Sequence, residues 1–293
     1  MKKEPLVSII LNCYNGEKYL KKCIESVISQ EYKNWELIFW DNLSTDNSKK
    51  IFCSFYDKRL KYFRSKNFLK LYEARNEAIK VSEGELISFI DCDDWWTTDK
   101  LVEQIPLFEN SKVGLVYSNF YYYYEKSKRK KSYKKKIFSG KIKKYLLNNF
   151  YIGILTSLIR KDAFYSVNGF DKSYDIIGDF DLNIKLSDNW LFQGVNKHLA
   201  YYRVHGQNLS IKKRDLEILE MEKWLTKKSS SENIDLSNIE NYVNYLKFFD
   251  ILRKGRRYDA FKKILKLKNN FLKLKSILLL VLPISIIEKL KAN

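Results

Sequence analysis

Three aspartates stand close together in the stretch FIDCDDWW (residues 89–96). Asp91, Asp93 and Asp94 directly follow an apolar run that is typical of a buried strand. Carboxylates this close repel one another and lose solvation when they are covered. In an extended segment Asp91 and Asp93 share a face, so both could serve one divalent cation, and oxygen ligands suit Mg²⁺ or Mn²⁺. On the triplet alone, a cation site and an acidic turn before a helix are equally good interpretations.

The elements around this triplet alternate between strand and helix. Runs of β-branched and apolar residues are followed by segments with apolar residues at helical spacing. This alternation predicts an α/β fold with a Rossmann-like, mostly parallel sheet flanked by helices, in which ligands bind beyond the carboxyl ends of the strands. Polar residues collect at that edge, at 12–16, 41–46 and 91–94. The strands are expected at 7–12, 35–42, 60–65, 86–91 and 113–120.

The composition indicates a negatively charged partner. The 293 residues carry a formal net charge of +19, from 54 Lys and Arg against 35 Asp and Glu. Nucleic acid, an anionic membrane face and phosphorylated small molecules all fit such a surplus. Four cysteines without a CxxC pair and only two histidines argue against a structural zinc site, and suggest thiols in a reducing compartment. The first apolar run is too short for a signal peptide, so we expect a cytoplasmic protein.

The last third of the chain differs from the rest. Beyond residue 212 the sequence is rich in Lys, Leu, Ile and Asn with helical periodicity, which predicts a helical extension at 213–293. Its apolar segment 276–287 is too short to span a bilayer, and either packs on the main domain or touches an anionic membrane surface. Earlier, the basic arm 126–136 is either a solvated hairpin or a contact for a membrane or polyanionic acceptor.

Five segments, in this order, resemble the inverting family 2 glycosyltransferases of the GT-A fold. The resemblance runs from Pro5 to Ile211. It implies a GT-A domain at 1–212, with a nucleotide-sugar half at about 1–120 and an acceptor half at about 121–212. The similar segments are the opening PLVSIILNCYNG…DNLSTDNS, the middle EARNEAIKVSEGELISFIDCDDWWTTDKL, and then NGFDKSY, GDFDLNIKLS and YYRVHGQNLS.

The resemblance implies a role for each of ten residues. Asp179 matches the catalytic base. Asp93 of the DxD element and His205 would hold the metal, and Asp41 matches the aspartate that contacts the base of the nucleotide. Without the family match, Asp179 could be only an N-cap, Arg203 the partner of a surface carboxylate, and His205 an ordinary loop histidine. The residues expected to bind the nucleotide-sugar are Asn12, Tyr14, Asn15, Asp41, Arg75, Asp91 and Arg203.

Three positions depart from the family pattern. Leu43 stands where the family often has glycine, and Glu77 stands where a glycine often follows Arg-Asn. Gly178 replaces the glutamate that usually precedes the base, which leaves Asp179 without an acidic neighbour. None of these changes removes a residue that the chemistry strictly needs.

The implied activity is metal-dependent, inverting sugar transfer. The donor would be a nucleoside diphosphate sugar, with a UDP-sugar favoured, and the cofactor Mn²⁺ or Mg²⁺. The acceptor would be a hydroxyl of a saccharide or lipid-linked saccharide in cell-surface polysaccharide biosynthesis, which places the protein at the inner face of the membrane as a peripheral protein.

Two other functions fit parts of the sequence. A sugar nucleotidyltransferase would want a glycine-rich, lysine-bearing phosphate loop, and CYNGEKYL is a poor version of one. A basic nucleic-acid-binding protein would place its charge on a recognised binding motif, and we find none. We therefore expect no nucleic-acid partner.

Overall fold

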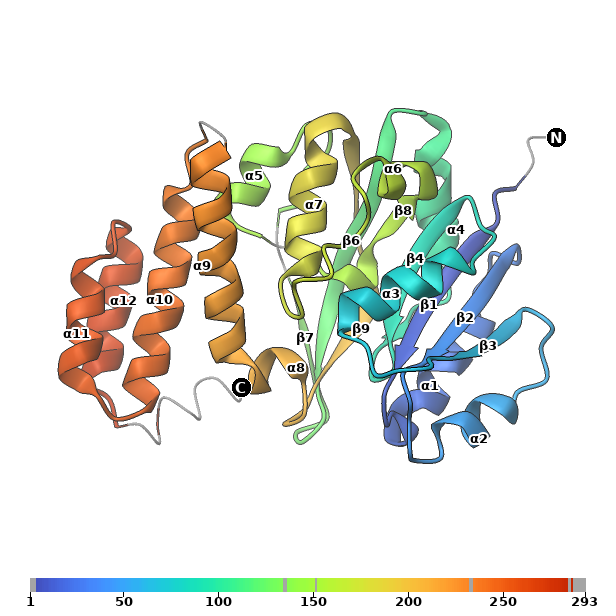
Figure 1. Ribbon diagram of the computed structural model, residues 1–293, viewed down its shortest axis with the longest axis horizontal. Helices are drawn as coiled ribbons and strands as arrows, with labels where there is room; N and C mark the ends of the chain where they lie inside the picture. The colour runs from blue at the N-terminus through green and yellow to red at the C-terminus, as the bar shows by residue number, and fades with distance from the viewer. Residues whose placement is uncertain (1–3, 134–135, 151, 232–233, 284–285, 287–293) are drawn as a thin grey trace. The chain divides into compact units, whose positions relative to one another are not determined.

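The computed structural model describes residues 4–133, 136–150, 152–231, 234–283 and 286 (Figure 1). The chain divides into two compact units. The first comprises residues 1–146 and 150–205, and the second comprises residues 147–149 and 206–293. The first unit ends at His205, a few residues before the domain boundary that the change of composition predicts near residue 212.

The first unit is built around one mixed sheet. Within the described residues its strands follow the order β3-β2-β1-β4-β8-β6-β9-β5, and β7 pairs with β6. β1, β2, β3 and β4 are parallel, as are β6 and β9, whereas β8, β5 and β7 pair antiparallel. The strands are β1 (Val7–Cys13), β2 (Trp35–Asp41), β3 (Leu60–Arg64), β4 (Leu86–Asp91), β5 (Trp95–Trp96), β6 (Val113–Tyr124), β7 (Arg129–Ser132), β8 (Leu158–Arg160) and β9 (Leu191–Val204).

Helices cover both faces of this sheet, which is why its central strands are mostly apolar and largely buried. Every residue of β1 is buried. Ile9 and Leu11 pack in one cluster with α1, whereas Phe89 meets Phe170 on the other side. The helices are α1 (Glu17–Ile28), α2 (Ser48–Cys53), α3 (Leu71–Lys80), α4 (Lys100–Gln104), α5 (Lys143–Asn148), α6 (Lys161–Ser166) and α7 (Gly178–Asn189), with short 3₁₀ turns η1 (Ile105–Glu109) and η2 (Ile154–Thr156).

The carboxyl ends of β1, β2 and β4 meet at one edge. Cys13 at the end of β1 is in register with Asp41 at the end of β2. On its other side β1 pairs with β4, where Asn12 is in register with Asp91. The polar residues expected to follow three separate strands therefore lie at a single edge of the sheet.

The tyrosine run continues a strand into a hairpin. β6 extends through Tyr124, and Tyr121 to Tyr124 pair with Ser132 to Arg129 of β7. The exposed residues of β7 belong to the basic arm 126–136. The described part of this arm is therefore a hairpin, as one of the two interpretations predicts. Residues 134–135 lie outside the described residues. Whether this arm contacts a partner stays a prediction.

The second unit is helical. Consecutive helices from α9 to α12 contact one another, and Phe248, Leu252 and Ile264 are central to their core. α12 contains the start of the apolar segment 276–287, whose residues 284–285 and 287 lie outside the described residues. The helices are α8 (Leu209–Lys212), α9 (Arg214–Ser231), α10 (Ser237–Arg253), α11 (Arg257–Leu265) and α12 (Asn270–Val281).

In the parts of the chain that are described, no helix combines the length and the apolar character that a bilayer crossing needs.

Candidate active site

The residues expected to hold a metal come together. Asp93 lies in the aspartate turn (residues 91–94), which connects β4 to β5. Its Oδ2 is 2.8 Å from Nε2 of His205, the residue after β9. The His205 ring packs on Tyr19 of α1 with 5.1 Å between ring centroids. Two residues that are 112 positions apart in sequence thus form one pair.

The pair of Asp93 and His205 fits a metal ion whose remaining ligands are supplied by substrate phosphates and water. Among the described residues, no group of three or more His, Cys, Asp or Glu side chains is arranged to hold a metal. Mg²⁺ is usually bound through one or two carboxylates together with water and substrate phosphates. A carboxylate beside an imidazole suits Mn²⁺ as well. Asp93 and His205 therefore fit an open site for either ion rather than a closed structural site.

Each aspartate of the turn has its own partner, which reduces the cost of crowding three carboxyl groups. Oδ1 of Asp91 is 2.6 Å from Nη2 of Arg75, a buried residue of α3. Asp94 is buried and accepts a hydrogen bond of 2.8 Å from the backbone N–H of Arg203. Burial, and then the charges of Asp93 and Asp91, raise the pKa of the Asp94 carboxyl well above its usual value. Asp94 therefore supports the turn from within the protein.

The side chain of Arg203 holds the aspartate turn. Its Nε donates to the backbone oxygen of Asp93 at 2.8 Å, and its Nη1 is 2.7 Å from Oε2 of Glu125. The guanidinium carbon lies 4.4 Å from the Tyr19 ring centroid and 4.7 Å from that of Trp95. Arg203 is only 6% exposed. These contacts define a positioning role, and direct contact of Arg203 with a diphosphate remains a prediction.

The turn after β1 packs directly on the aspartate turn. A Cβ atom at Gly16 would lie 2.8 Å from Sγ of both Cys13 and Cys92, which is too close for any side chain. Cys92 is the residue between Asp91 and Asp93, so Gly16 permits the two turns to touch. Both thiols are free, as expected from the sequence.

Asp179 lies in the first turn of α7 and has an unusual environment. Its Oδ1 accepts hydrogen bonds from the hydroxyl of Tyr72 at 3.2 Å and from the backbone N–H of Phe180 at 2.8 Å. Burial raises the pKa of the Asp179 carboxyl to about 6, although the charge of Arg75 opposes the rise. A carboxylate with a pKa in this range can accept a proton near neutral pH.

Tyr72 explains the departure at Gly178. A Cβ atom at Gly178 would lie 2.4 Å from Cδ2 of the Tyr72 ring, so the ring occupies the space that a side chain at 178 would need. The backbone oxygen of Ile176 lies 3.0 Å from the Tyr72 hydroxyl, so the single hydroxyl proton is shared between this oxygen and Oδ1 of Asp179. The sequence did not single out Tyr72, because nothing local connects residue 72 to residue 178.

One helix joins the two carboxylate centres. Tyr72 and Arg75 are three residues apart on α3, so their side chains share a face. Tyr72 contacts Asp179, and Arg75 is paired with Asp91. The aspartate turn and the candidate base are therefore linked through α3 and belong to one site.

Asp41 ends β2 at the same edge of the sheet. It is fully buried; Oδ1 accepts from the backbone N–H of Ser44 at 2.7 Å, and Oδ2 accepts from the Tyr62 hydroxyl at 2.6 Å and from Nη1 of Arg64 at 3.2 Å. The Arg64 side chain is 44% exposed. Tyr62 and Arg64 were missed from sequence, although both lie on the expected strand β3.

The end of β1 and the loop that follows it carry three more of the expected residues. Asn15 has a φ of 53°, and its Oδ1 accepts from the backbone N–H of Thr45 at 2.8 Å. Tyr14 is half-exposed and meets Phe68 edge-on at 4.9 Å. Oδ1 of Asn12 is buried and has no hydrogen-bond partner, as expected of a group that is satisfied by a ligand.

The turn after β2 departs from the family pattern at a strained position. Leu43 has a φ of 67°, the left-handed region that favours glycine. A glycine at this position would adopt the conformation without strain, whereas a leucine costs on the order of 1 kcal/mol. The turn nevertheless keeps Asp41 in place.

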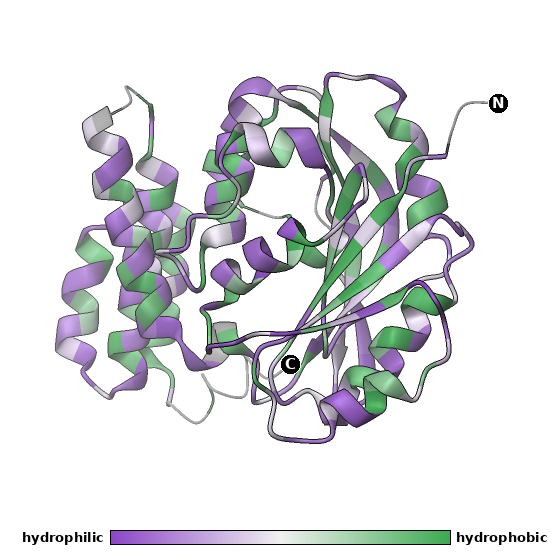
Figure 2. Cartoon of the chain, turned by 45° about the vertical axis from the view of Figure 1, so that its right-hand side comes forward, coloured by the Kyte–Doolittle hydropathy of each residue, from purple (hydrophilic) through white to green (hydrophobic). Residues whose placement is uncertain are grey.

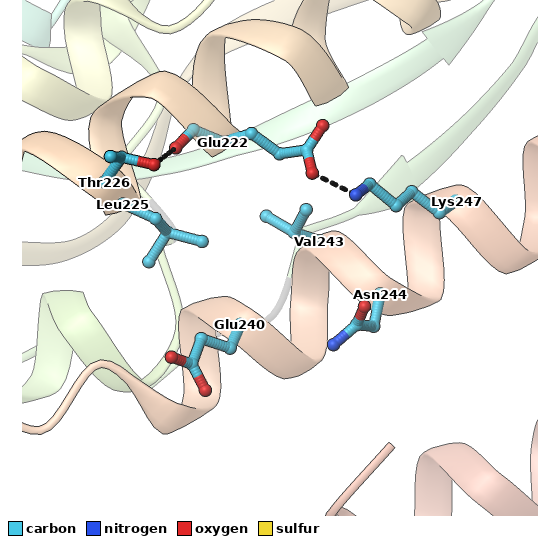
Figure 3. A pocket seen from close by; sticks show the side chains of 7 residues that line it. All are labelled: Glu222, Leu225, Thr226, Glu240, Val243, Asn244 and Lys247. Atoms are coloured by element: carbon cyan, nitrogen blue, oxygen red, sulfur yellow. Dashed lines mark hydrogen bonds and ion pairs between the residues drawn. The ribbon is translucent and has the colours of Figure 1, made fainter. Parts of the chain in front are cut away.

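A hollow of about 250 Å³ lies in the second unit, between α9 and α10 (Figure 3). Its lysine, Lys247, is already paired with Glu222. None of the ten residues expected to act in sugar transfer lines it, so we do not assign it to the active site. Its lining residues are Glu222, Leu225, Thr226, Glu240, Val243, Asn244 and Lys247.

Fold and site together define a GT-A type α/β protein with carboxylates gathered at the edge of the sheet. Residues 8–172, more than half of the chain, match the family described as Glycosyl transferase family 2. The chain belongs to this family, as the sequence motifs predicted.

Two relatives illustrate the range of the match. WfaP of Escherichia coli, described as a UDP-Glc:alpha-D-GlcNAc-diphosphoundecaprenol beta-1,3-glucosyltransferase, is 40% identical over 116 residues, which are 40% of this chain and 46% of WfaP. TuaG of Bacillus subtilis, described as a putative teichuronic acid biosynthesis glycosyltransferase, is 28% identical over 217 residues, which are 72% of this chain and 83% of TuaG. The match thus spans less than half of WfaP.

Two solved structures confirm the expected fold. S. aureus TarS, residues 1–349 in complex with UDP-GlcNAc, superposes with a TM-score of 0.62 at 16% identity, covering 84% of this chain and 72% of that one. The mannosyltransferase PcManGT from Pyrobaculum calidifontis, in complex with GDP-Man and Mn²⁺, gives 0.67 at 14% identity, covering 99% and 85%.

Proposed function

We propose that the protein is a metal-dependent, inverting glycosyltransferase. It moves a sugar from a nucleoside diphosphate sugar to a hydroxyl of a saccharide or lipid-linked acceptor in cell-surface polysaccharide biosynthesis. The observation that carries this proposal is the linkage through α3, in which Arg75 pairs with Asp91 and Tyr72 hydrogen-bonds Asp179, whose pKa is about 6.

The reaction needs a base and a stabilised leaving group. The acceptor oxygen bonds to the anomeric carbon while the bond from that carbon to the phosphate oxygen breaks, and the acceptor proton passes to Asp179. One displacement inverts the anomeric centre and forms no covalent intermediate. A Mn²⁺ or Mg²⁺ ion held by Asp93 and His205 would neutralise the charge on the departing diphosphate.

Tyr72 acts as a positioning residue for Asp179. Its hydroxyl and the N–H of Phe180 both donate to Oδ1, which fixes the carboxylate and leaves Oδ2 to accept the proton. The aromatic ring occupies the position of the side chain that usually precedes the base. The glutamate that is missing at 178 is thus replaced by a hydroxyl from another helix.

A uridine nucleotide is the proposed nucleotide of the donor. Uracil presents carbonyl acceptors beside a ring N–H donor, and the half-exposed Arg64 guanidinium, which pairs with the buried Asp41, can donate to those carbonyls. Asn12, Tyr14 and Asn15 would complete this part of the pocket. WfaP is named for UDP-Glc, and TarS was solved with UDP-GlcNAc. PcManGT was solved with GDP-Man, so a panel of donors must include GDP-sugars beside UDP-sugars.

A lipid-linked acceptor would bring the protein to a membrane. WfaP is named for a diphosphoundecaprenol-linked acceptor, and the chain has a strong positive charge. We therefore propose a peripheral protein at the inner, cytoplasmic face.

The test is a donor panel assayed with Mn²⁺, with Mg²⁺ and after chelation. We expect transfer from a UDP-sugar that chelation abolishes, and a loss of about 10²-fold or more in Asp93→Asn. Release of pyrophosphate from a nucleoside triphosphate and a sugar phosphate would instead identify a nucleotidyltransferase. Transfer that persists without a divalent ion would contradict the proposed metal dependence.

A further inference from the structure

The exposed face of α12 is apolar. Phe271, Leu274, Leu278 and Val281 recur at intervals of three and four residues and therefore share a face. Phe271 and Val281 are each 73% exposed. Ile277 lies on the same face and is also exposed. An ordinary surface helix presents polar residues on its exposed side.

The opposite face of α12 already supplies the packing that holds the helix. Leu279, Leu280 and Leu282 pack against the buried cluster of Phe248 and Leu252, and Ser276 is buried. The exposed leucines of α12 therefore do not contribute to the packing of the core. Mutating them should leave the fold intact.

α11, which contacts α12, repeats the pattern. Ala260 and Ile264 are buried, whereas Tyr258, Phe261 and Leu265 are exposed. These three residues follow the same spacing of three and four. Figure 2 colours the chain by hydropathy, and hydrophobic residues (green) recur among hydrophilic ones along the helices of the second unit. We call the eight exposed apolar residues of α11 and α12 the apolar face.

Basic residues are frequent in the segment that carries the apolar face, although Lys254 pairs with Asp250 and Lys268 with Glu240. Residues 253–283 contain ten Lys or Arg and one acidic residue, Asp259, which is paired with Arg256. This segment carries nine of the surplus positive charges, about half of the +19 of the whole chain. Nζ of Lys262 lies 4.4 Å from the Tyr258 ring centroid, so basic and apolar groups are interleaved.

We propose that the apolar face is a docking surface for an anionic phospholipid bilayer. Apolar and aromatic side chains enter the boundary between headgroups and acyl chains, while lysines reach the phosphates along their flexible stems. The charge argues against a second copy of the chain as the occupant, because two such surfaces would repel each other. This inference rests on the proposed function in one respect: docking on a membrane would bring the active site to a lipid-linked acceptor.

The experiment measures vesicle binding of the full chain by sedimentation. The probes are vesicles of phosphatidylglycerol with phosphatidylcholine, and vesicles of phosphatidylcholine alone. We expect binding to the anionic vesicles that weakens as salt is raised. The double variant Leu274→Gln/Leu278→Gln should bind them about tenfold or more weakly, because two exposed leucines no longer enter the interface.

Matched variants separate this surface from others. Leu219→Gln makes the same change at an exposed leucine of α9, and it should bind within about twofold of the wild type. Lys130→Gln/Lys131→Gln tests the basic arm, and should reduce binding less than the α12 variant does. Circular dichroism and the thermal midpoint should be unchanged in the α12 variant.

Two results would overturn the proposal: no binding to anionic vesicles at low salt, or wild-type binding by Leu274→Gln/Leu278→Gln. A dimer that this variant dissociates, with vesicle binding unchanged, would assign the apolar face to a second copy instead. Vesicle binding needs no nucleotide-sugar, and transfer to a water-soluble acceptor needs no vesicle. The proposed function and this inference can therefore fail separately.

Discussion

At the scale of single residues, environment separates carboxylates that look alike in the sequence. Asp91 is paired with a buried arginine, whereas Asp179 is held in a site that raises its pKa to about 6. A group that is still protonated just below neutral pH, and ionised above it, suits a general base.

The first prediction concerns the pH dependence of transfer. The rate should rise with pH and level off above about 6, because only the ionised form of Asp179 accepts a proton. The Tyr72 hydrogen bond lowers the pKa of Asp179, so Tyr72→Phe should move the acid limb to higher pH. We also expect a roughly tenfold lower plateau, the value of one hydrogen bond to a charged group. A merely structural Tyr72 would leave the acid limb unmoved.

The same pKa predicts a cost in stability. A carboxyl whose pKa is raised on folding contributes stability that is complete below its ordinary value of 3.8 and is lost as the pH rises through about 6. Asp179→Asn removes this penalty, so it should be more stable than the wild type at pH 8 by about 1 to 3 kcal/mol. The difference should vanish near pH 4. Urea unfolding at the two pH values measures it, and equal stabilities at pH 8 would contradict it.

Gly178→Ala tests whether the Tyr72 ring occupies the space that a side chain at position 178 would need. The new Cβ would be 2.4 Å from that ring, so the ring must move and its hydrogen bond to Asp179 must weaken. We expect a loss of about 1 to 3 kcal/mol in unfolding free energy and a fall in kcat of about tenfold or more. Gly206→Ala is the control, since no atom lies within 4 Å of its Cβ. Wild-type activity of Gly178→Ala would refute the close packing.

At the scale of elements, the aspartate turn depends on β9. Arg203 holds the backbone of Asp93, and His205 pairs with its side chain. Arg203→Lys keeps the charge but loses the planar fork that reaches Asp93 and Glu125 together.

We therefore predict that Arg203→Lys raises the Mn²⁺ concentration needed for half-maximal activity by about tenfold. The folded content by circular dichroism should not change. Lys128→Gln is the matched control, because Lys128 pairs with the same Glu125 from an exposed position, and exposed pairs contribute little. An unchanged Mn²⁺ requirement in Arg203→Lys would show that the turn holds its shape without the guanidinium.

The strands of the parallel part were predictable because their apolar runs are continuous, whereas the antiparallel pairings of β5 and β8 were not. β5 has two residues and β8 has three, which is too short to leave a periodic signal. The site divides in the same way. Asp91, Asp93 and Asp179 lie in motifs, but Tyr72, Arg64 and Glu125 act through contacts between residues far apart in sequence, which no local pattern reports.

At the scale of the whole molecule, the charge and the exposed apolar residues are both consistent with the proposed docking on an anionic membrane. The alternation of strands and helices predicted the first unit, and the change in composition predicted a helical second unit. The sequence alone left open whether 276–287 packs or meets a membrane. One face of α12 packs on the core of the second unit, and docking of its exposed apolar face on lipid remains a proposal.

The central claim is that Asp179 accepts the proton of the acceptor hydroxyl, while other residues of the same site bind the metal and the nucleotide. The most direct test measures donor binding and single-turnover transfer by Asp179→Asn with Mn²⁺. We predict donor affinity within about twofold of the wild type, and a transfer rate lower by about 10²- to 10⁴-fold. Transfer at the wild-type rate, or loss of donor binding together with transfer, would contradict the account.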